Sequence, residues 1–288
     1  MTRDDRAAQP TEGPQTDALD EAVGSAAAED PGGNTSAGVL DRLPAPGALI
    51  FDLDGTLVDT VETRIEAWLR TFREIGMPAD RAHVAGLIGA DGRRLAREVA
   101  GVAGRTLSDD RAEAVDRRAG EIYSELNTDP RPLAGAVGLL RELQQGDLPW
   151  AIATSSRAEQ VMASVDALEL PQRPPIVDGS HVAHAKPAPD LLLLTAERLG
   201  SPARRCWCVG DAAWDMLAAR AAGMPGIGVV TGAVDERALR SAGASTTIRS
   251  LAELHEELRR RDILGAGAGH SDHPAAGART AMDAVEPG

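Results

Sequence analysis

Short apolar runs and stretches of helical period alternate through the second half of the chain. From about residue 133, hydrophobic residues recur at helical spacing in segments separated by brief, continuous apolar runs. The runs expected to form strands are 149–153, 176–177, 206–209, 226–230 and 246–248. Repeating strand–helix units are typical of a parallel sheet with helices on both faces. The pattern therefore predicts an α/β fold with a Rossmann-like parallel sheet core, which the earlier apolar run 49–51 joins as its first strand.

Between residues 60 and 130 the pattern is helical throughout. Apolar residues recur at helical spacing after residue 60, and further helices are expected at 81–88, 93–100 and 109–126. No strand signal interrupts them. We therefore predict a discontinuous core, residues 47–60 and 131–263, with an α-helical insert at 61–130. On this pattern alone, a plain helical packing module remains the alternative to a functional cap.

Composition and charge argue against several classes of protein. Residues 1–46 and 264–288 are rich in small and polar residues, which predicts a disordered acidic arm and a disordered tail. The formal net charge of −14 disfavours nucleic acid and anionic membranes as partners. No apolar stretch approaches the roughly 20 residues of a membrane span, and the N-terminus has no signal-peptide core. We expect a cytoplasmic protein whose Cys206 and Cys208 are core residues.

Candidate chemistry begins where the first strand ends, in Asp52-Leu53-Asp54-Gly55-Thr56. Open α/β sheets bind ligands beyond the carboxyl ends of their strands, so the two carboxylates are placed to share one small site. Gly55 permits a sharp turn and a close approach of the backbone to a ligand. Asp59 and Glu62 have the spacing of a capping box, which predicts that a helix starts immediately afterwards. A plain turn initiated by the two aspartates is the alternative for this segment alone.

Three later segments carry further polar groups. Thr154 and Ser155 follow the second strand, where hydroxyls and backbone amides suit a phosphate, although such residues also cap helices. Lys186, before a helix, is the only lysine of the chain. A compact ammonium suits a crowded site that must neutralise a carboxylate and a phosphate oxygen. Asp211 and Asp215 follow a later strand in the pattern Gly-Asp-x-x-x-Asp.

These four segments, in this order and with a helical insert after the first, resemble the motifs of the haloacid dehalogenase-like hydrolases. The resemblance is to the branch of phosphoglycolate phosphatases and β-phosphoglucomutases, which has a helical C1 cap at the position of the insert. It covers the chain apart from its two ends. It implies that Asp52 is the nucleophile that attacks phosphorus and that Asp54 is the general acid and base. Thr154, Ser155 and Lys186 are the implied phosphate-binding groups.

The same resemblance implies a site for Mg²⁺, a hard cation that prefers oxygen ligands. Asp52, the backbone carbonyl of Asp54, and Asp211 are the implied protein ligands. Asp215 is implied to act through water or by orienting its neighbours. The implied reaction is the magnesium-dependent hydrolysis of a small soluble phosphomonoester through an aspartyl-phosphate intermediate.

Other activities of the family fit these residues less well. Dehalogenases lack the second aspartate of the first motif, and phosphonoacetaldehyde hydrolases need a cap lysine, which residues 60–130 do not contain. β-Phosphoglucomutase-like sugar-phosphate mutases share every motif, but they usually have a histidine in the first cap helix, where this chain has Arg64. A non-catalytic binding module is the alternative outside enzymes, and the presence of Asp52 and Lys186 argues against it.

The substrate is only partly indicated. Arg93 and Arg94 lie in a cap segment where related enzymes place a substrate-specificity loop. They are candidates to contact a second anionic group, which makes phosphoglycolate or a sugar phosphate a reasonable substrate. An exposed helix start with solvated arginines is the alternative. We expect a small phosphate ester as the binding partner, and a monomer or a homodimer.

Overall fold

The computed structural model describes residues 40–264 of the chain. Within this range, a six-stranded sheet has the order β3-β2-β1-β4-β5-β6, and every neighbouring pair is parallel. The strands are β1 (Ala48–Phe51), β2 (Trp150–Ala153), β3 (Ile176–Val177), β4 (Cys206–Gly210), β5 (Gly226–Val229) and β6 (Thr246–Ile248). The predicted α/β fold with a parallel sheet is confirmed.

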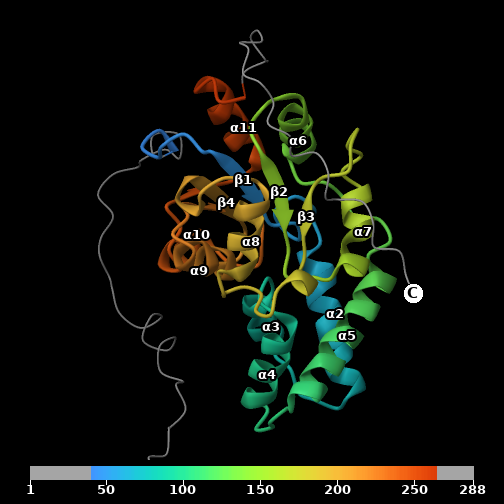
Figure 1. Ribbon diagram of the computed structural model, residues 1–288. Helices are drawn as coiled ribbons and strands as arrows, with labels where there is room; N and C mark the ends of the chain where they lie inside the picture. The colour runs from blue at the N-terminus through green and yellow to red at the C-terminus, as the bar shows by residue number, and fades with distance from the viewer. Residues whose placement is uncertain (1–39, 265–288) are drawn as a thin grey trace, which may run out of the picture.

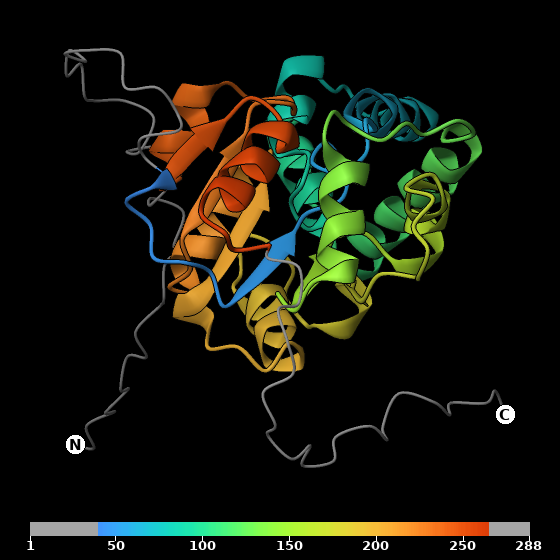
Figure 2. The same ribbon diagram turned by 90° about the horizontal axis from the view of Figure 1, so that it is seen from above.

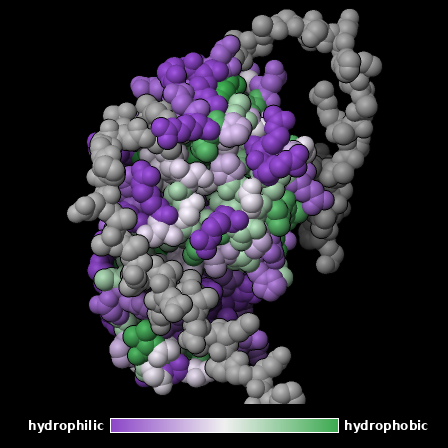
Figure 3. Space-filling view, turned by 90° about the vertical axis from the view of Figure 1, so that its left-hand side faces the viewer, coloured by the Kyte–Doolittle hydropathy of each residue, from purple (hydrophilic) through white to green (hydrophobic). Residues whose placement is uncertain are grey.

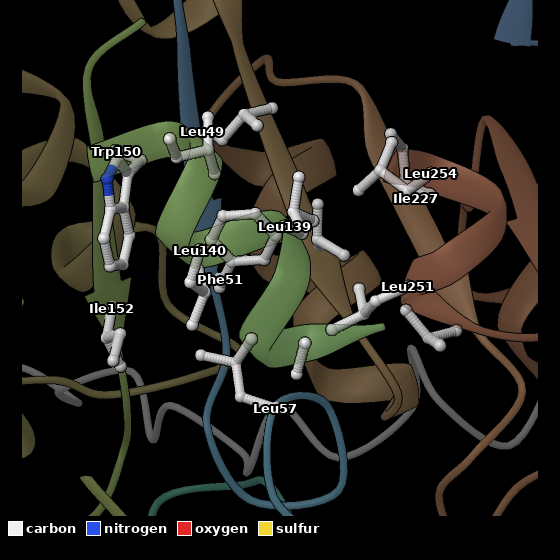
Figure 4. Packing of buried hydrophobic residues seen from close by; sticks show 14 of the residues in the cluster. Leu49, Phe51, Leu57, Leu139, Leu140, Trp150, Ile152, Ile227, Leu251 and Leu254 are labelled. Atoms are coloured by element: carbon white, nitrogen blue, oxygen red, sulfur yellow. The ribbon is translucent and has the colours of Figure 1, made fainter. Parts of the chain in front are cut away.

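Helices cover both faces of this sheet (Figures 1 and 2). They are α6 (Ala136–Gln145), α7 (Ala158–Asp166), α8 (Asp190–Arg198), α9 (Ala213–Ala221), α10 (Glu236–Ser241) and α11 (Leu251–Arg260). Leu139 of α6 and Leu254 of α11 share one buried cluster with Phe51 of the first strand, as Figure 4 shows. Leu192 of α8 and Ala218 of α9 belong to a second cluster, which packs on the opposite face.

The central strand β1 shows why a continuous apolar run predicts a buried parallel strand. Leu49 and Phe51 belong to the first cluster, whereas Ala48 and Ile50 belong to the second. Successive side chains of a strand point to opposite faces, so both faces need apolar residues when helices cover both. Cys206 and Cys208 likewise lie in the second cluster, buried and outside any disulfide.

Four helices lie between β1 and β2 in the chain and gather at one end of the molecule (Figure 1). They are α2 (Val61–Glu74), α3 (Arg81–Leu87), α4 (Gly92–Val102) and α5 (Asp109–Leu126). Their hydrophobic cluster includes Phe72, Val84 and Leu95, and it also takes in Ala212 and Trp214 at the start of α9. The predicted cap boundaries, 61 and 130, fall at the start of α2 and shortly after the end of α5.

The start of α2 corrects one prediction from the sequence. The helix begins where it was expected, but its N-cap is Thr60, which makes no side-chain capping bond. The expected capping box of Asp59 and Glu62 is therefore wrong. The Thr60 hydroxyl donates instead to the Asp54 carboxylate, at 2.6 Å, so the helix start is tied to the candidate site.

The two ends of the described range differ from the predicted tails. Leu40, placed in the predicted arm 1–46, is only 1% exposed, and the Arg261 side chain donates to its carbonyl oxygen. Leu264, placed in the predicted tail, packs in the first cluster. The arm and tail predictions are thus wrong for these apolar residues, which gain more from burial than from solvation. The remainder of both predictions, residues 1–39 and 265–288, lies outside the described residues.

Few large apolar side chains are exposed in the described part of the chain. Figure 3 shows polar side chains spread over one face, with apolar groups scattered between them. Val102 is the most exposed of the large hydrophobic side chains, at 74%. Among helices of residues 40–264, none combines the length and the apolar character needed to cross a bilayer.

Candidate active site

Three neighbouring strands deliver the candidate catalytic groups to one edge of the sheet. Asp52 follows β1, Thr154 follows β2 and Asp211 follows β4, and β1 lies between the other two strands. The strands are parallel and in close register, with Phe51 opposite Ile152 and Val209, so their ends coincide. All three polar side chains are buried. This is the position at which open α/β sheets bind ligands.

Lys186 joins this group from the loop before α8. Its Nζ lies 2.6 Å from Asp52 Oδ1 and 2.7 Å from Asp215 Oδ1, and it donates to the carbonyl oxygen of Ala153. The side chain is 1% exposed. Burial disfavours the charged ammonium, but the charges of Asp215 and Asp52 outweigh this and hold the pKa of Lys186 above its ordinary value. The only lysine of the chain is therefore a buried cation fixed between two carboxylates.

Asp52, Asp211 and Asp215 form a compact carboxylate cluster. Each offers one oxygen, and these oxygens lie within 4.8 Å of one another. Burial raises the pKa of Asp52 to about 7, against the opposing charge of Lys186. Burial also raises the pKa of Asp211, and the charges of Asp52 and Asp215 add to the effect. Three carboxylates and one ammonium leave an excess of negative charge, which fits a hard divalent cation such as Mg²⁺.

The turn after β1 is built so that the cluster can form. Gly55 has φ +88°, and a Cβ added there would lie 2.3 Å from Asp211 Oδ2. Thr56 Oγ1 donates to Asp211 Oδ1 at 2.7 Å, while Thr231 Oγ1 donates to the Gly55 carbonyl oxygen. Asp215 accepts a hydrogen bond from the backbone N–H of Ala212. The space left by the missing side chain of Gly55 is thus occupied by Asp211, while the close approach of Gly55 to a ligand stays a prediction.

Asp54 has a different environment from Asp52. Its carboxylate accepts hydrogen bonds from Thr60 at 2.6 Å, Arg64 at 2.7 Å and Tyr123 at 2.9 Å. Burial alone would raise the pKa of Asp54, but the charge of Arg64 and the hydrogen bonds from Thr60, Arg64 and Tyr123 together outweigh it and hold the pKa below its ordinary value. The Arg64 guanidinium also lies 3.4 Å from the centre of the Tyr123 ring. Asp54 is therefore held as an ionised carboxylate.

Tyr123 was not identified from the sequence. It is the only tyrosine of the chain, on α5, and its hydroxyl also lies 3.3 Å from Ser164 Oγ on α7. It thus links the helical insert, the core and the Asp54 carboxylate. Lys186 stands out in the sequence because it is the only lysine of the chain, and Tyr123 stands out in the same way as the only tyrosine.

The hydroxyls after β2 lie beside the same site. Thr154 Oγ1 accepts from the backbone N–H of Ser156, and Ser155 Oγ donates to the carbonyl oxygen of Gly89 in the helical insert. The N-cap of α7 is Arg157, so neither Thr154 nor Ser155 is used to cap that helix. Their role in phosphate binding stays a prediction.

A cavity of about 60 Å³ lies between the insert and the strand ends. Its lining includes Asp52, Asp54, Arg64, Trp68, Ile88, Leu95, Asp116, Thr154, Ser155, Arg157 and Gln160. This volume is below the range of about 300–1,000 Å³ that is usual for ligand sites. Asp52 and Asp54 form a polar base at one end of the cavity. Residues of the helical insert form a partly apolar wall at the other end.

The two arginines proposed for substrate specificity do not line this cavity. Arg93 Nη2 lies 2.7 Å from Asp91 Oδ2 and donates to the carbonyl oxygen of Ala183. Arg94 pairs with Glu98 at 3.2 Å, and its guanidinium lies 5.2 Å from the Trp214 ring. Both guanidinium groups thus have partners within the protein.

Comparison with known proteins places this arrangement in a family. The family model described as haloacid dehalogenase-like hydrolase matches residues 49–229. Fructose-1-phosphate phosphatase YqaB of Escherichia coli is 33% identical over 187 residues, which cover 63% of this chain and 95% of that protein. A phosphoglycolate phosphatase of Xanthomonas campestris is 31% identical over 189 residues, covering 65% and 84% respectively. A hydrolase from Pseudomonas syringae of known structure aligns with a TM-score of 0.70 and 33% identity, covering 74% of this chain and 98% of that one.

These matches agree with the geometry of the strand ends. The matched range includes Asp52, Lys186 and Asp215, together with the helical insert between the first two strands. The resemblance inferred from the four sequence motifs is therefore confirmed. The chain belongs to the haloacid dehalogenase-like hydrolase family.

Proposed function

We propose that the protein is a magnesium-dependent phosphatase that hydrolyses a small phosphomonoester through an aspartyl-phosphate on Asp52. The observation that carries the proposal is the position of Asp52, which lines the cavity while its carboxylate contacts Lys186 Nζ at 2.6 Å. The two relatives described above are both phosphatases by name, which supports a phosphate ester as the substrate. Because the two relatives are named for different substrates, they do not identify the alcohol part of the phosphate ester.

In the first step, an oxygen of Asp52 attacks phosphorus and the bond to the leaving alkoxide breaks. Lys186 and Thr154 neutralise charge on the phosphoryl oxygens, which is the main requirement of phosphoryl transfer. Asp54 lines the same cavity; it is ionised in the structure, so it must first take up a proton from solvent, which it then donates to the leaving oxygen. In the second step, Asp54 accepts a proton from the water that attacks the phosphoryl group and releases Asp52. Its ionised, hydrogen-bonded form in the structure is the form that this second step requires.

The residues that would hold Mg²⁺ are Asp52, Asp211 and the backbone carbonyl of Asp54. Asp215 is bound to Lys186 and would orient that lysine or act through water. A bound Mg²⁺ supplies positive charge that screens the repulsion between an aspartate nucleophile and a phosphate oxygen. The excess negative charge of the buried cluster supports this assignment.

A hydrolase is favoured over a sugar-phosphate mutase by the residue at position 64. The mutases usually have a histidine there, whereas Arg64 forms an ion pair with Asp54 and a hydrogen bond with Gln160. A mutase would interconvert sugar phosphates when given a bisphosphate activator. The cytoplasmic location and the monomeric or dimeric state stay predictions.

Hydrolysis of p-nitrophenyl phosphate tests the proposal. We expect release of p-nitrophenol with Mg²⁺, loss of release after EDTA, and a fall of at least 10³-fold for Asp52→Asn, because about 4 kcal/mol or more of transition-state stabilisation depends on the nucleophile. Asp59→Asn is the matched control, since Asp59 lies in the same loop with an exposed side chain. Full activity of Asp52→Asn, with an unchanged unfolding midpoint, contradicts the proposal.

A further inference from the structure

The cavity contains a carboxylate that the proposed chemistry does not use. Asp116, on α5, lines the cavity with its side chain 20% exposed. The nearest oppositely charged group is Arg157, with Nη2 3.5 Å from Asp116 Oδ2. Gly92 makes room for this carboxylate, because a Cβ there would lie 1.8 Å from Asp116 Oδ1. A hydrogen-bond acceptor is thus held at the cavity wall, away from the cluster around Asp52.

The positive groups of the cavity are already paired. Arg64 is bound to Asp54, and Arg157 forms a close ion pair with Glu113 as well as its longer contact with Asp116. Beside the cavity, Arg93 is bound to Asp91. Each lining arginine therefore has another carboxylate partner, and the charge of Asp116 is in excess. A substrate with a second anionic group would meet this carboxylate, and both arginines of the cavity lining, Arg64 and Arg157, already have carboxylate partners.

Part of the remaining wall is apolar. Trp68, Ile88 and Leu95 line the cavity, and the Trp68 ring is stacked on Phe72 with ring centroids 5.5 Å apart. An apolar wall of this kind suits carbon–hydrogen groups, while a few polar groups fix the orientation of a ligand. One acceptor carboxylate beside an apolar wall matches a carbon chain that bears hydroxyl groups.

We propose that the leaving group is a neutral polyol whose hydroxyl donates to Asp116, and that Asp116 excludes phosphate esters with a carboxylate in the alcohol part. This inference rests on the proposed phosphatase function. It selects the sugar-phosphate class over the phosphoglycolate class. It also assigns specificity to Asp116 in place of Arg93 and Arg94, because like charges that must approach each other in a cavity penalise the wrong ligand.

A matched pair of ligands tests the inference. Sorbitol 6-phosphate and gluconate 6-phosphate differ in that a terminal hydroxymethyl group is replaced by a carboxylate. We expect kcat/KM to favour sorbitol 6-phosphate by about tenfold or more, and inhibition of p-nitrophenyl phosphate hydrolysis to show the same order of binding. Asp116→Asn should reduce this preference by about tenfold, chiefly through a lower KM or inhibition constant for gluconate 6-phosphate. Asp110→Asn, an exposed change on the same helix, should leave it unaltered.

Arg157→Gln provides a second variant with the opposite expected effect. It removes the cation beside Asp116, so the preference for sorbitol 6-phosphate should widen. Equal use of the two ligands by the wild type, binding of neither at millimolar concentration, or an unchanged ratio in both Asp116→Asn and Arg157→Gln overturns the inference. If p-nitrophenyl phosphate is hydrolysed in those cases, the proposed function stands. Absence of hydrolysis of any phosphate ester refutes the proposed function itself.

Discussion

Asp116 should destabilise the folded protein at neutral pH, and its replacement should show this. Burial raises the pKa of Asp116 from 3.8 to about 6, against the opposing charge of Arg157, and the charges of Asp91 and Glu113 add to the rise. The folded state therefore keeps the proton over a range in which the unfolded chain has lost it. Stability contributed by the protonated group is present at low pH and is lost as the pH rises from about 4 to above 6.

The magnitude follows from the shift of about two pKa units. At 1.36 kcal/mol per unit, the penalty above pH 6 is at most about 3 kcal/mol, and partial exposure of the side chain reduces it. Asp116→Asn should therefore be more stable than the wild type by about 1 to 3 kcal/mol at pH 8. At pH 5.2, just above the isoelectric point of about 4.9, the advantage should be smaller by about 1 kcal/mol. A charge retained at a cost in stability is common at functional sites.

Urea unfolding at these two pH values, in the presence of EDTA, measures the effect. Asp110→Asn is the control on the same helix and should change stability by less than about 0.5 kcal/mol at both pH values. If Asp116→Asn is no more stable than the wild type at pH 8, the charge of Asp116 does not lower the free energy of unfolding as the structure indicates. An advantage that does not shrink at pH 5.2 would show that protonation is not its cause.

Two further predictions concern the cluster around Asp52. Mg²⁺ should raise the unfolding midpoint of the wild type, by the equivalent of about 2.7 kcal/mol at a concentration 100-fold above Kd. It should have little effect on the midpoint of Asp211→Asn. Equal midpoint shifts in both proteins would exclude Asp211 as a ligand. Lys186→Arg should lower kcat by about 10²-fold or more, because a planar guanidinium cannot replace a compact ammonium held between Asp52 and Asp215. Undiminished kcat in the folded variant would show that catalysis does not depend on an ammonium in this position.

The sequence was sufficient to predict the sheet and the groups at its edge. The run from Leu49 to Phe51 is apolar at every position because helices bury both faces of β1. Parallel strands end at the same edge, so polar residues after such runs, among them Asp52 and Asp211, are expected to converge. Local pattern is enough here, because strand direction and register follow from the fold class.

The helical insert was less predictable in its chemistry. Asp116 and Arg157 line the cavity, and Tyr123 reaches Asp54, because α5 packs against α7. Neither spacing nor composition specifies that docking. The capping box failed for a related reason, since Thr60 uses its hydroxyl for Asp54. Arg93 is paired with Asp91, two residues away. A search of the sequence for basic residues does not show which of them are already paired.

Chemical trapping of Asp52 tests the central claim most directly. An aspartyl-phosphate is an acyl phosphate, which sodium borohydride reduces to the alcohol, so the aspartate becomes homoserine. The enzyme is mixed with Mg²⁺ and p-nitrophenyl phosphate, quenched with borohydride during turnover, digested and sequenced by mass spectrometry. We predict homoserine at position 52 that depends on both substrate and Mg²⁺. Turnover without homoserine at position 52, or with homoserine at another aspartate, would contradict the account.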